Sequence, residues 1–314
     1  MQLLDQLAAL GYNGVRVFAG HLEWAGQTAA YARSGLGIFF EACQIRGLYV
    51  LVSAITDSGI EDYNLEEHID EIGAVCAQYD NTLLEIANEP YHETQRREVH
   101  DFAYLRGLAA RVPADVLVGL GAAADDESLD GRDGEFIPIH LDRGRDTWNE
   151  VRRVREAEAV EDATGKPAII QETTKAYDLE QEGKWESRPE YFYALGVNGR
   201  LFEVGIVFHS ENGLQAQPLD AATEACARDC VAGFTAIPLD VPTLEYHNAG
   251  DPASPVHRAN FDNVVRCHSA IDGNRGWTFA EGIADGKDPE IEWNWPVHDL
   301  IDTRPQLRLY AATR

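Results

Sequence analysis

The sequence predicts an α/β fold, and a TIM (β/α)8 barrel is the favoured architecture. Helix-like and strand-like segments alternate along residues 1–214 with short connections, and seven short apolar runs have the character of buried strands. This alternation is typical of a parallel sheet with helical crossovers. A doubly wound open sheet is the main alternative. It is disfavoured because no glycine-rich phosphate-binding turn follows an early strand.

Each predicted element rests on its own pattern of apolar residues. The segment 64–79 shows the helical pattern well, because Leu65, Ile69, Ile72 and Val75 recur at intervals of three or four. Pro138 lies inside a predicted strand, so that strand requires a bulge or a position without a ladder donor. The predicted strands are 15–18, 48–54, 83–87, 116–120, 136–141, 168–171 and 205–208. The predicted helices are 2–10, 28–46, 64–79, 95–112, 147–164, 189–203 and 221–234.

The order of these elements implies that the usual N-terminal first strand is lacking, because the chain starts on the helix that normally follows it. An incomplete parallel barrel exposes two strand edges, so we expect a segment after residue 240 to cover or complete it. Residues 1–235 are predicted to form the barrel. Residues 236–314 are rich in proline with little periodicity, which predicts an irregular C-terminal extension packing on or completing the barrel.

Composition narrows the classes of partner. The chain has 53 Asp and Glu against 26 Lys and Arg, a formal net charge of −27 that repels phosphate backbones and anionic lipids. We therefore expect no nucleic-acid or membrane partner. No signal-like segment is visible at the start, so the expected location is cytoplasmic as written, with an N-terminally truncated secreted protein as the alternative. The five cysteines contain no C-x-x-C pair and are predicted to be mostly reduced and buried.

Polar residues follow the predicted strands, where a barrel carries its reactive groups. Two of them are glutamates: Glu89 follows the run LLEIA at 83–87, and Glu172 follows PAIIQ at 167–171. Two strand-end glutamates are the minimum equipment for cleaving a glycosidic bond. The other strand-end candidates are Arg16, Thr56, Asp57, Asn88, residues 122–125, His140, His209 and Glu211.

Two motifs carry a resemblance to a known family. Counting a missing first strand places Glu89 on strand four and Glu172 on strand seven. The sequence GYNGVR at 11–16 and the sequence LEIANEP at 84–90 then resemble the strand-two and strand-four patterns of the clan A glycoside hydrolases. The resemblance covers about residues 1–235. It implies Glu89 as general acid/base, Glu172 as nucleophile, Asn88 as a donor to the sugar 2-hydroxyl, and Arg16 as a support for Glu172.

These implied roles fit the chemistry of a retaining glycosidase. The two carboxyl groups of such an enzyme lie about 5 to 5.5 Å apart, so that one attacks the anomeric carbon while the other protonates the leaving oxygen. Glu89 must then rest protonated and Glu172 ionised, and Arg16 beside Glu172 would separate their pKa values in that direction. Strand alternation places Asn88 and Glu89 on opposite faces, so a bulge is expected there.

The expected ligand is a carbohydrate, and no cofactor is expected. His140 and His209 are candidate replacements for the aromatic sugar contacts that the family usually has, and Trp24, with Trp148 and Trp185, is a candidate for stacking on sugar rings. Two alternatives stay open. One is a metal-dependent barrel enzyme acting on a sugar, with Glu89, His140, Glu172 and His209 as ligands. The other is a barrel that binds glycans without cleaving them.

Overall fold

The computed structural model describes residues 2–20, 29–60, 63–122, 133–140, 154, 157, 160–161, 163–173, 189–201, 204–208 and 217–236. The chain divides into two compact units. The first comprises residues 1–141 and 160–172, and the second comprises residues 142–159 and 173–314. The predicted segment after residue 240 lies outside the described residues, as do the loops that contain Trp24, Trp148 and Trp185. Of the predicted C-terminal extension, only residue 236 is described.

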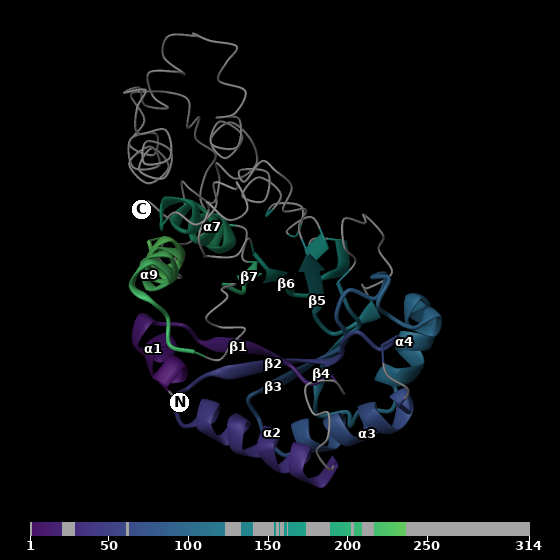
Figure 1. Cartoon of the computed structure of the whole chain (residues 1–314). Coiled ribbons are helices and arrows are strands. Elements are labelled where there is room, and N and C mark those ends of the chain that lie inside the picture. The colour runs from purple at the N-terminus through teal and green to yellow at the C-terminus, as the bar shows by residue number, and fades with distance from the viewer. Residues whose placement is uncertain are drawn as a thin grey trace. The chain divides into compact units, whose positions relative to one another are not determined.

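Parallel strands form the centre of the first unit. Four of them pair in the order of the chain, and two more pair further along (Figure 1). The N–H of Glu135 donates to the carbonyl of Val118 at 2.6 Å, so the segment that leads into β5 lies beside β4. The parallel arrangement confirms the prediction, although the ladders of the described strands do not close a ring. The strands are β1 (Gly14–Phe18), β2 (Tyr49–Ile55), β3 (Thr82–Ala87), β4 (Leu117–Gly119), β5 (Ile137–His140) and β6 (Ala168–Glu172).

One helix before β1 and three in the connections between strands cover one face of the β1–β4 sheet. They are α1 (Gln2–Leu10), α2 (Ala29–Gln44), α3 (Leu65–Cys76) and α4 (Phe102–Ala109), and α2 and α3 lie along the same side of the sheet (Figure 1). Helix α3 begins where the Asn64 side chain accepts the N–H of Glu67 at 3.1 Å, which satisfies a donor that the first helical turn leaves unpaired.

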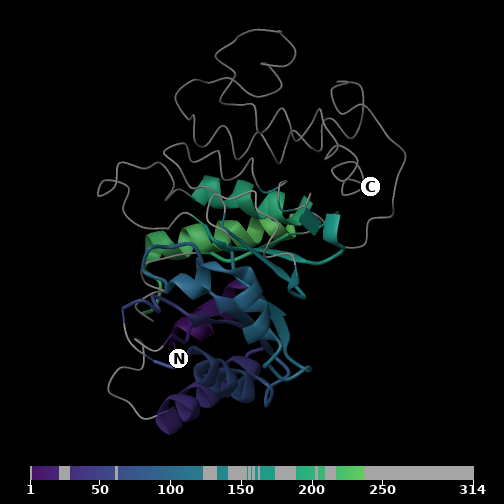
Figure 2. The same cartoon turned by 90° about the vertical axis from the view of Figure 1, so that its right-hand side faces the viewer.

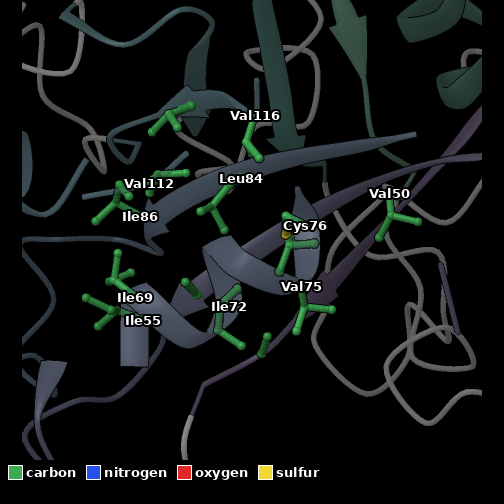
Figure 3. Packing of buried hydrophobic residues seen from close by; sticks show 14 of the residues in the cluster. Val50, Ile55, Ile69, Ile72, Val75, Cys76, Leu84, Ile86, Val112 and Val116 are labelled. Carbon is green, nitrogen blue, oxygen red and sulfur yellow. The ribbon is translucent and has the colours of Figure 1, made fainter. Parts of the chain in front are cut away.

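The hydrophobic core of the first unit lies between the sheet and these helices. Ile69 and Ile72 of α3 lie close to Leu84 and Ile86 of β3, and all four are buried (Figure 3). Full burial of a side chain of this size contributes about 1.5–3 kcal/mol. Because side chains alternate along a strand, the same apolar residues leave Glu85 pointing to the opposite face of the sheet.

The helix predicted at 95–112 is not continuous in the structure. The segment 95–112 was expected to be a single helix, but it contains a short 3-10 helix, η2 (Arg97–His100), followed by a separate α4. Asp101 lies between them in an extended conformation, and its side chain accepts the N–H of Ala103 at 2.8 Å. Aspartate is among the preferred N-cap residues, so a new helix starts here.

Pro138 in β5 occupies a position where no ladder donor toward β6 is needed, as its missing N–H requires. The N–H of Ile137 donates to the carbonyl of Pro167, just before β6. The nitrogen of Pro138 therefore faces away from β6, and no ladder bond to β6 is lost. A register shift follows between Ile139 and His140, which pairs His140 with Glu172.

The second unit contains α7 (Pro189–Leu201), β7 (Gly205–Ile206) and α9 (Ala221–Thr235). Helices α7 and α9 lie side by side in both views (Figure 1, Figure 2). Their contact is close because glycines occur on both helices. A Cβ on Gly196 would lie 2.0 Å from the carbonyl oxygen of Cys230, and one on Gly233 would lie 2.0 Å from that of Tyr193.

Four cysteines lie in the described part of the chain, and all four are buried thiols, as predicted; they are Cys43, Cys76, Cys226 and Cys230. Burial raises the pKa of Cys43 to about 11 and that of Cys76 to about 12, so both remain protonated at neutral pH. None of the helices in the described ranges is long and apolar enough to cross a membrane.

Candidate active site

The ends of three strands bring two glutamates and a histidine together in the first unit. Glu89 follows β3, His140 ends β5 and Glu172 ends β6. One ligand atom of each lies within 4.8 Å of those of the other two. β3 runs parallel to its neighbours in one sheet, and β5 and β6 run parallel in another, and the carboxyl ends of the three strands meet at this cluster. The carboxylates that the strand-end pattern selected are therefore neighbours in space.

Arg16 on β1 links four other residues. Its side chain is 7% exposed. Its Nη1 donates to Glu172 Oε1 at 3.2 Å, and its Nη2 donates to Glu85 Oε2 at 2.9 Å and to Asn88 Oδ1 at 2.7 Å. Its Nε donates to Ser53 Oγ at 3.0 Å. The planar guanidinium fork can make these bonds at once, which a single ammonium group cannot do.

The bond from Arg16 fixes which end of the Asn88 amide accepts. Since Nη2 donates to Oδ1, the other arm of the amide is its NH2 group, a hydrogen-bond donor. The bond also couples the residue before Glu89 to the guanidinium that contacts Glu172. Arg16 therefore contacts both Glu172 and Asn88, the residue before Glu89.

The direction of the Glu89 side chain is set by a left-handed backbone conformation, and not by a β-bulge. Strand β3 ends at Ala87, the N–H of Asn88 donates to the carbonyl of Ile55 at 2.9 Å, and Glu89 has φ of +41°. The prediction of a bulge between Asn88 and Glu89 was therefore wrong. A left-handed conformation outside glycine costs about 1–3 kcal/mol and persists only where the surroundings impose it.

Two loops impose that conformation by bonding to each other. The loop after β3 supplies Gln95, whose Nε2 donates to the carbonyl of Asn88 at 2.6 Å. Its Oε1 accepts both the hydroxyl of Ser58, at 2.8 Å, and the backbone N–H of Ser58 in the loop after β2. The N–H of Gly59 donates to the carbonyl of Thr94 at 2.7 Å. We call this set of bonds between residues 58–59 and 88–95 the loop clamp.

His140 lies directly beside Glu89. Its side chain is 3% exposed, and Nδ1 is 3.2 Å from Glu89 Oε1. Its Nε2 is buried and has no hydrogen-bond partner within the parts of the chain that the structure describes. The imidazole therefore restricts where the Glu89 carboxyl can point.

Glu85 and Ser53 are site residues that the strand-end pattern missed. Glu85 is fully buried in the middle of β3, and its Oε2 accepts from Arg16 and from Ser53 Oγ. Ser53 in β2 pairs in register with Glu85. A lone charged residue inside the otherwise apolar run LLEIA was the available signal.

The other predicted residues divide into two groups. Asp57 has φ of +42° and accepts a hydrogen bond from Thr94, so it belongs to the contact between the two loops. Trp24 and His209, with Glu211, lie outside the described residues.

The acidic and imidazole groups also carry the donor atoms that a divalent cation would use. Glu89, His140 and Glu172 offer two oxygens and a nitrogen within 4.8 Å. The Arg16 guanidinium, however, is bonded to Glu172 Oε1 at 3.2 Å. A fixed positive charge at that oxygen opposes a cation in the same place.

The structure of the chain was compared with those of known proteins, and the similar structures indicate its fold. No protein-family model and no curated protein matches the chain. The structure is similar to the GH5_18 protein of Streptomyces cattleya in complex with GlcNAc, at 17% identity and a TM-score of 0.59, over 97% of this chain and 92% of that one. It is also similar to the GH5-4 broad-specificity endoglucanase of Clostridium cellulovorans, at 13% identity and a TM-score of 0.52, over 74% of this chain and 86% of that one.

A third similar structure is a GH5 xyloglucan-specific β-1,4-glucanase from a ruminal metagenomic library, in complex with XXLG. The identity is 12% and the TM-score 0.52, over 78% of this chain and 89% of that one. These likenesses confirm the predicted TIM-barrel fold for the chain.

Proposed function

We propose that this chain is a glycoside hydrolase that cleaves a β-linked glycan with retention of configuration. The observation that carries the proposal is that Glu89 and Glu172 offer carboxylate oxygens within 4.8 Å of each other. That spacing fits a retaining enzyme, whose carboxyl groups lie about 5–5.5 Å apart. An inverting enzyme needs roughly 6.5–9.5 Å, to leave room for a water molecule.

The surroundings of the two glutamates support different roles for them. Arg16 at 3.2 Å favours the ionised form of Glu172, which suits a nucleophile. Glu89 lies near the Glu172 carboxylate and beside His140, and a proton retained on Glu89 reduces the repulsion between the two carboxylates. We therefore assign Glu172 as nucleophile and Glu89 as general acid/base.

In the proposed cycle Glu172 attacks the anomeric carbon while Glu89 protonates the leaving oxygen, giving a glycosyl-enzyme. Glu89 then removes a proton from water, and that water releases the sugar from Glu172. The NH2 group of Asn88, whose Oδ1 is held by Arg16, is the donor we assign to the sugar 2-hydroxyl. His140, together with Trp24 and His209, is proposed to contact the substrate.

The similar structures suggest which substrates to try. Those proteins are described as an endoglucanase, a xyloglucan-specific glucanase and a GH5_18 protein bound to GlcNAc, and a variant of the last is bound to Manβ1-4GlcNAc, at 16% identity and a TM-score of 0.57. We propose a β-linked glucan or a mannose-containing oligosaccharide as the substrate class.

The test is a hydrolysis screen on β-glucans, xyloglucan, mannans, xylans, galactans, Manβ1-4GlcNAc and aryl β-glycosides. Glu172→Gln should lower turnover by at least about a thousandfold, because it removes the nucleophile and keeps the shape. The control Glu41→Gln neutralises an exposed glutamate on α2 and should retain full activity. NMR of the first product should show the anomeric configuration of the substrate. An inverted product, or unchanged turnover in both Glu89→Gln and Glu172→Gln, would refute the two-glutamate mechanism.

The same screen separates the alternatives. A barrel that only binds glycans would show affinity without turnover on every substrate. Loss of activity in chelator, followed by recovery with a divalent ion, would favour metal-dependent chemistry. We expect chelator to leave activity unchanged, because Arg16 already provides the positive charge at Glu172.

A further inference from the structure

A third glutamate, Glu85, belongs to the same cluster but does not lie at a strand end. It sits in the middle of β3 and is fully buried. A buried carboxylate is costly unless it is paired, and its pairing here is with Arg16, at 2.9 Å, and with Ser53. The mechanism proposed above does not use it. Its position therefore calls for a separate explanation.

The hydrogen bonds of Glu85 converge on one oxygen. Oε2 accepts both from Arg16 Nη2 and from Ser53 Oγ, whereas Oε1 is buried and has no partner within the described ranges. Ser53 Oγ also accepts from Arg16 Nε. Glu85, Ser53 and Arg16 thus form a closed triangle of hydrogen bonds that holds two nitrogens of the guanidinium.

Once those two nitrogens are held, the direction of the third is set as well, because the guanidinium is planar and rigid. Nη1 then points to Glu172 Oε1, and the second bond of Nη2 reaches Asn88 Oδ1. We propose that Glu85 is a positioning residue whose buried carboxylate, together with Ser53, holds Arg16 in the orientation that serves Glu172 and Asn88. This inference rests on the proposed function.

The proposal has an electrostatic consequence beyond simple packing. Among the described residues, the charged groups linked to Glu85 are Arg16 on β1 and, through it, Glu172 on β6, while the neutral Ser53 and Gly119 pair with it from β2 and β4. Glu89 and His140 adjoin Glu172. Glu85 and Glu172 therefore share one guanidinium, and the negative charge of Glu85 disfavours ionisation of both working glutamates.

Two variants separate charge from hydrogen bonding. Glu85→Gln keeps the shape, and its single carbonyl oxygen can still accept from both Arg16 and Ser53, since both bonds converge on Oε2. It removes the charge and places an NH2 group where Oε1 was, while the acceptor of both bonds is kept. Glu85→Met fills a similar volume and removes the acceptor too. The control Asp70→Asn removes one exposed carboxylate, paired with Arg111 on the surface, and makes the same change in net charge.

The first measurement is the pH dependence of kcat/KM. Both limbs of the profile should move to lower pH by at least about 0.5 unit in Glu85→Gln, because ionisation of each glutamate becomes easier. Glu85→Met should lower kcat by at least about a hundredfold with KM changed by less than about threefold. Limbs that stay in place in Glu85→Gln, or that move equally in Asp70→Asn, would overturn the proposal.

The second measurement does not need turnover. The Nε–H of Arg16, which donates to Ser53, should give a protected side-chain signal in proton–nitrogen NMR of the wild type and of Glu85→Gln. Glu85→Met should speed its exchange at least about tenfold. Equal protection in all three proteins would show that Glu85 does not hold Arg16. If the wild type hydrolyses no glycoside, the proposed function fails while this measurement still decides the role of Glu85. If Glu85→Met does not fold, the Glu85→Gln profile decides it.

Discussion

At the scale of single residues, the site depends on one buried cation. Arg16 donates to Ser53, Glu85, Asn88 and Glu172, and its guanidinium carbon lies 4.8 Å from the centre of the Phe18 ring. Two of its acceptors are carboxylates, one of them fully buried. Removing the arginine would leave that buried carboxylate without its cation, so this contact should matter for folding as well as for chemistry.

The first prediction measures that contribution. Arg16→Met should lower the free energy of unfolding by about 3–5 kcal/mol, because it breaks a buried ion pair and leaves Glu85 unpaired. The matched control Arg111→Met breaks the exposed pair with Asp70 and should cost less than about 1 kcal/mol. Urea unfolding followed by circular dichroism gives both values. The double variant Arg16→Met with Glu85→Met should recover much of the loss; no recovery would mean that Glu85 is not the group left unpaired.

The residues at strand ends were predictable because a parallel sheet gathers them at one edge. Glu89 and Glu172 needed only the positions of the apolar runs, whereas the role of Arg16, in the middle of β1, followed from the resemblance to a known family. Glu85 and Ser53 were missed because they lie inside strands, where only the register shows that they face each other and Arg16. That register depends on contacts between segments far apart in the sequence, which no local pattern contains.

At the scale of elements, the loop clamp is the part of the site that should respond to distant changes. Gln95 joins the loop after β3 to the loop after β2 through Asn88 and Ser58. The two strands are already paired, so the clamp adds little to the topology. Its effect is on the direction of the backbone at Asn88 and Glu89.

The second prediction concerns Gln95→Leu. This change leaves buried partners of Gln95 unsatisfied, which should lower the free energy of unfolding by about 2–4 kcal/mol. It should also lower kcat/KM at least about tenfold, because Glu89 loses its fixed direction. The control Gln78→Leu removes an exposed side chain that donates to the carbonyl of Ala74 in the preceding turn, and it should leave both quantities nearly unchanged. A Gln95→Leu protein with full activity would show that the clamp does not direct Glu89.

The third prediction tests the contact between α7 and α9. Gly196→Ala should destabilise the protein by about 3 kcal/mol or more, because the new Cβ would lie 2.0 Å from the carbonyl oxygen of Cys230 and the helices would have to separate. Gly107→Ala in α4 is the control, since nothing lies within 4 Å of its Cβ position. It should raise stability by up to about 1 kcal/mol through helix propensity. Thermal unfolding of both variants gives the comparison, and similar midpoints would contradict it.

Elements were predicted best where one physical signal dominated. The strand predicted at 83–87 from its apolar run and the helix predicted at 64–79 from its spacing correspond to β3 (Thr82–Ala87) and α3 (Leu65–Cys76). The segment 95–112 failed because its apolar spacing continues through Asp101, whereas the chain uses that side chain to cap a new helix. Capping is decided by one residue, and a pattern averaged over many residues conceals it.

At the scale of the whole molecule, the excess of acidic residues sets the response to salt. The formal net charge of −27 produces self-repulsion that acts against the compact state. The fourth prediction is that raising KCl from about 20 mM to 0.5 M increases the thermal midpoint, because the Debye length falls from roughly 20 Å to about 4 Å. Sorbitol at matched osmolality is the control for non-ionic effects. A midpoint that falls with KCl, or an equal rise in sorbitol, would show that self-repulsion is not what limits stability.

The left-handed backbone at Glu89 has a consequence for how this protein would change under selection. Glutamate at φ of +41° carries a conformational cost that its role in the proposed reaction would explain. Glycine is the residue that adopts this conformation without that cost. In a saturation library at position 89 sorted only for folded protein, glycine and asparagine should therefore be enriched over glutamate. In a lineage released from the need to turn over substrate, this codon would be among the first to drift, and in the direction of greater stability.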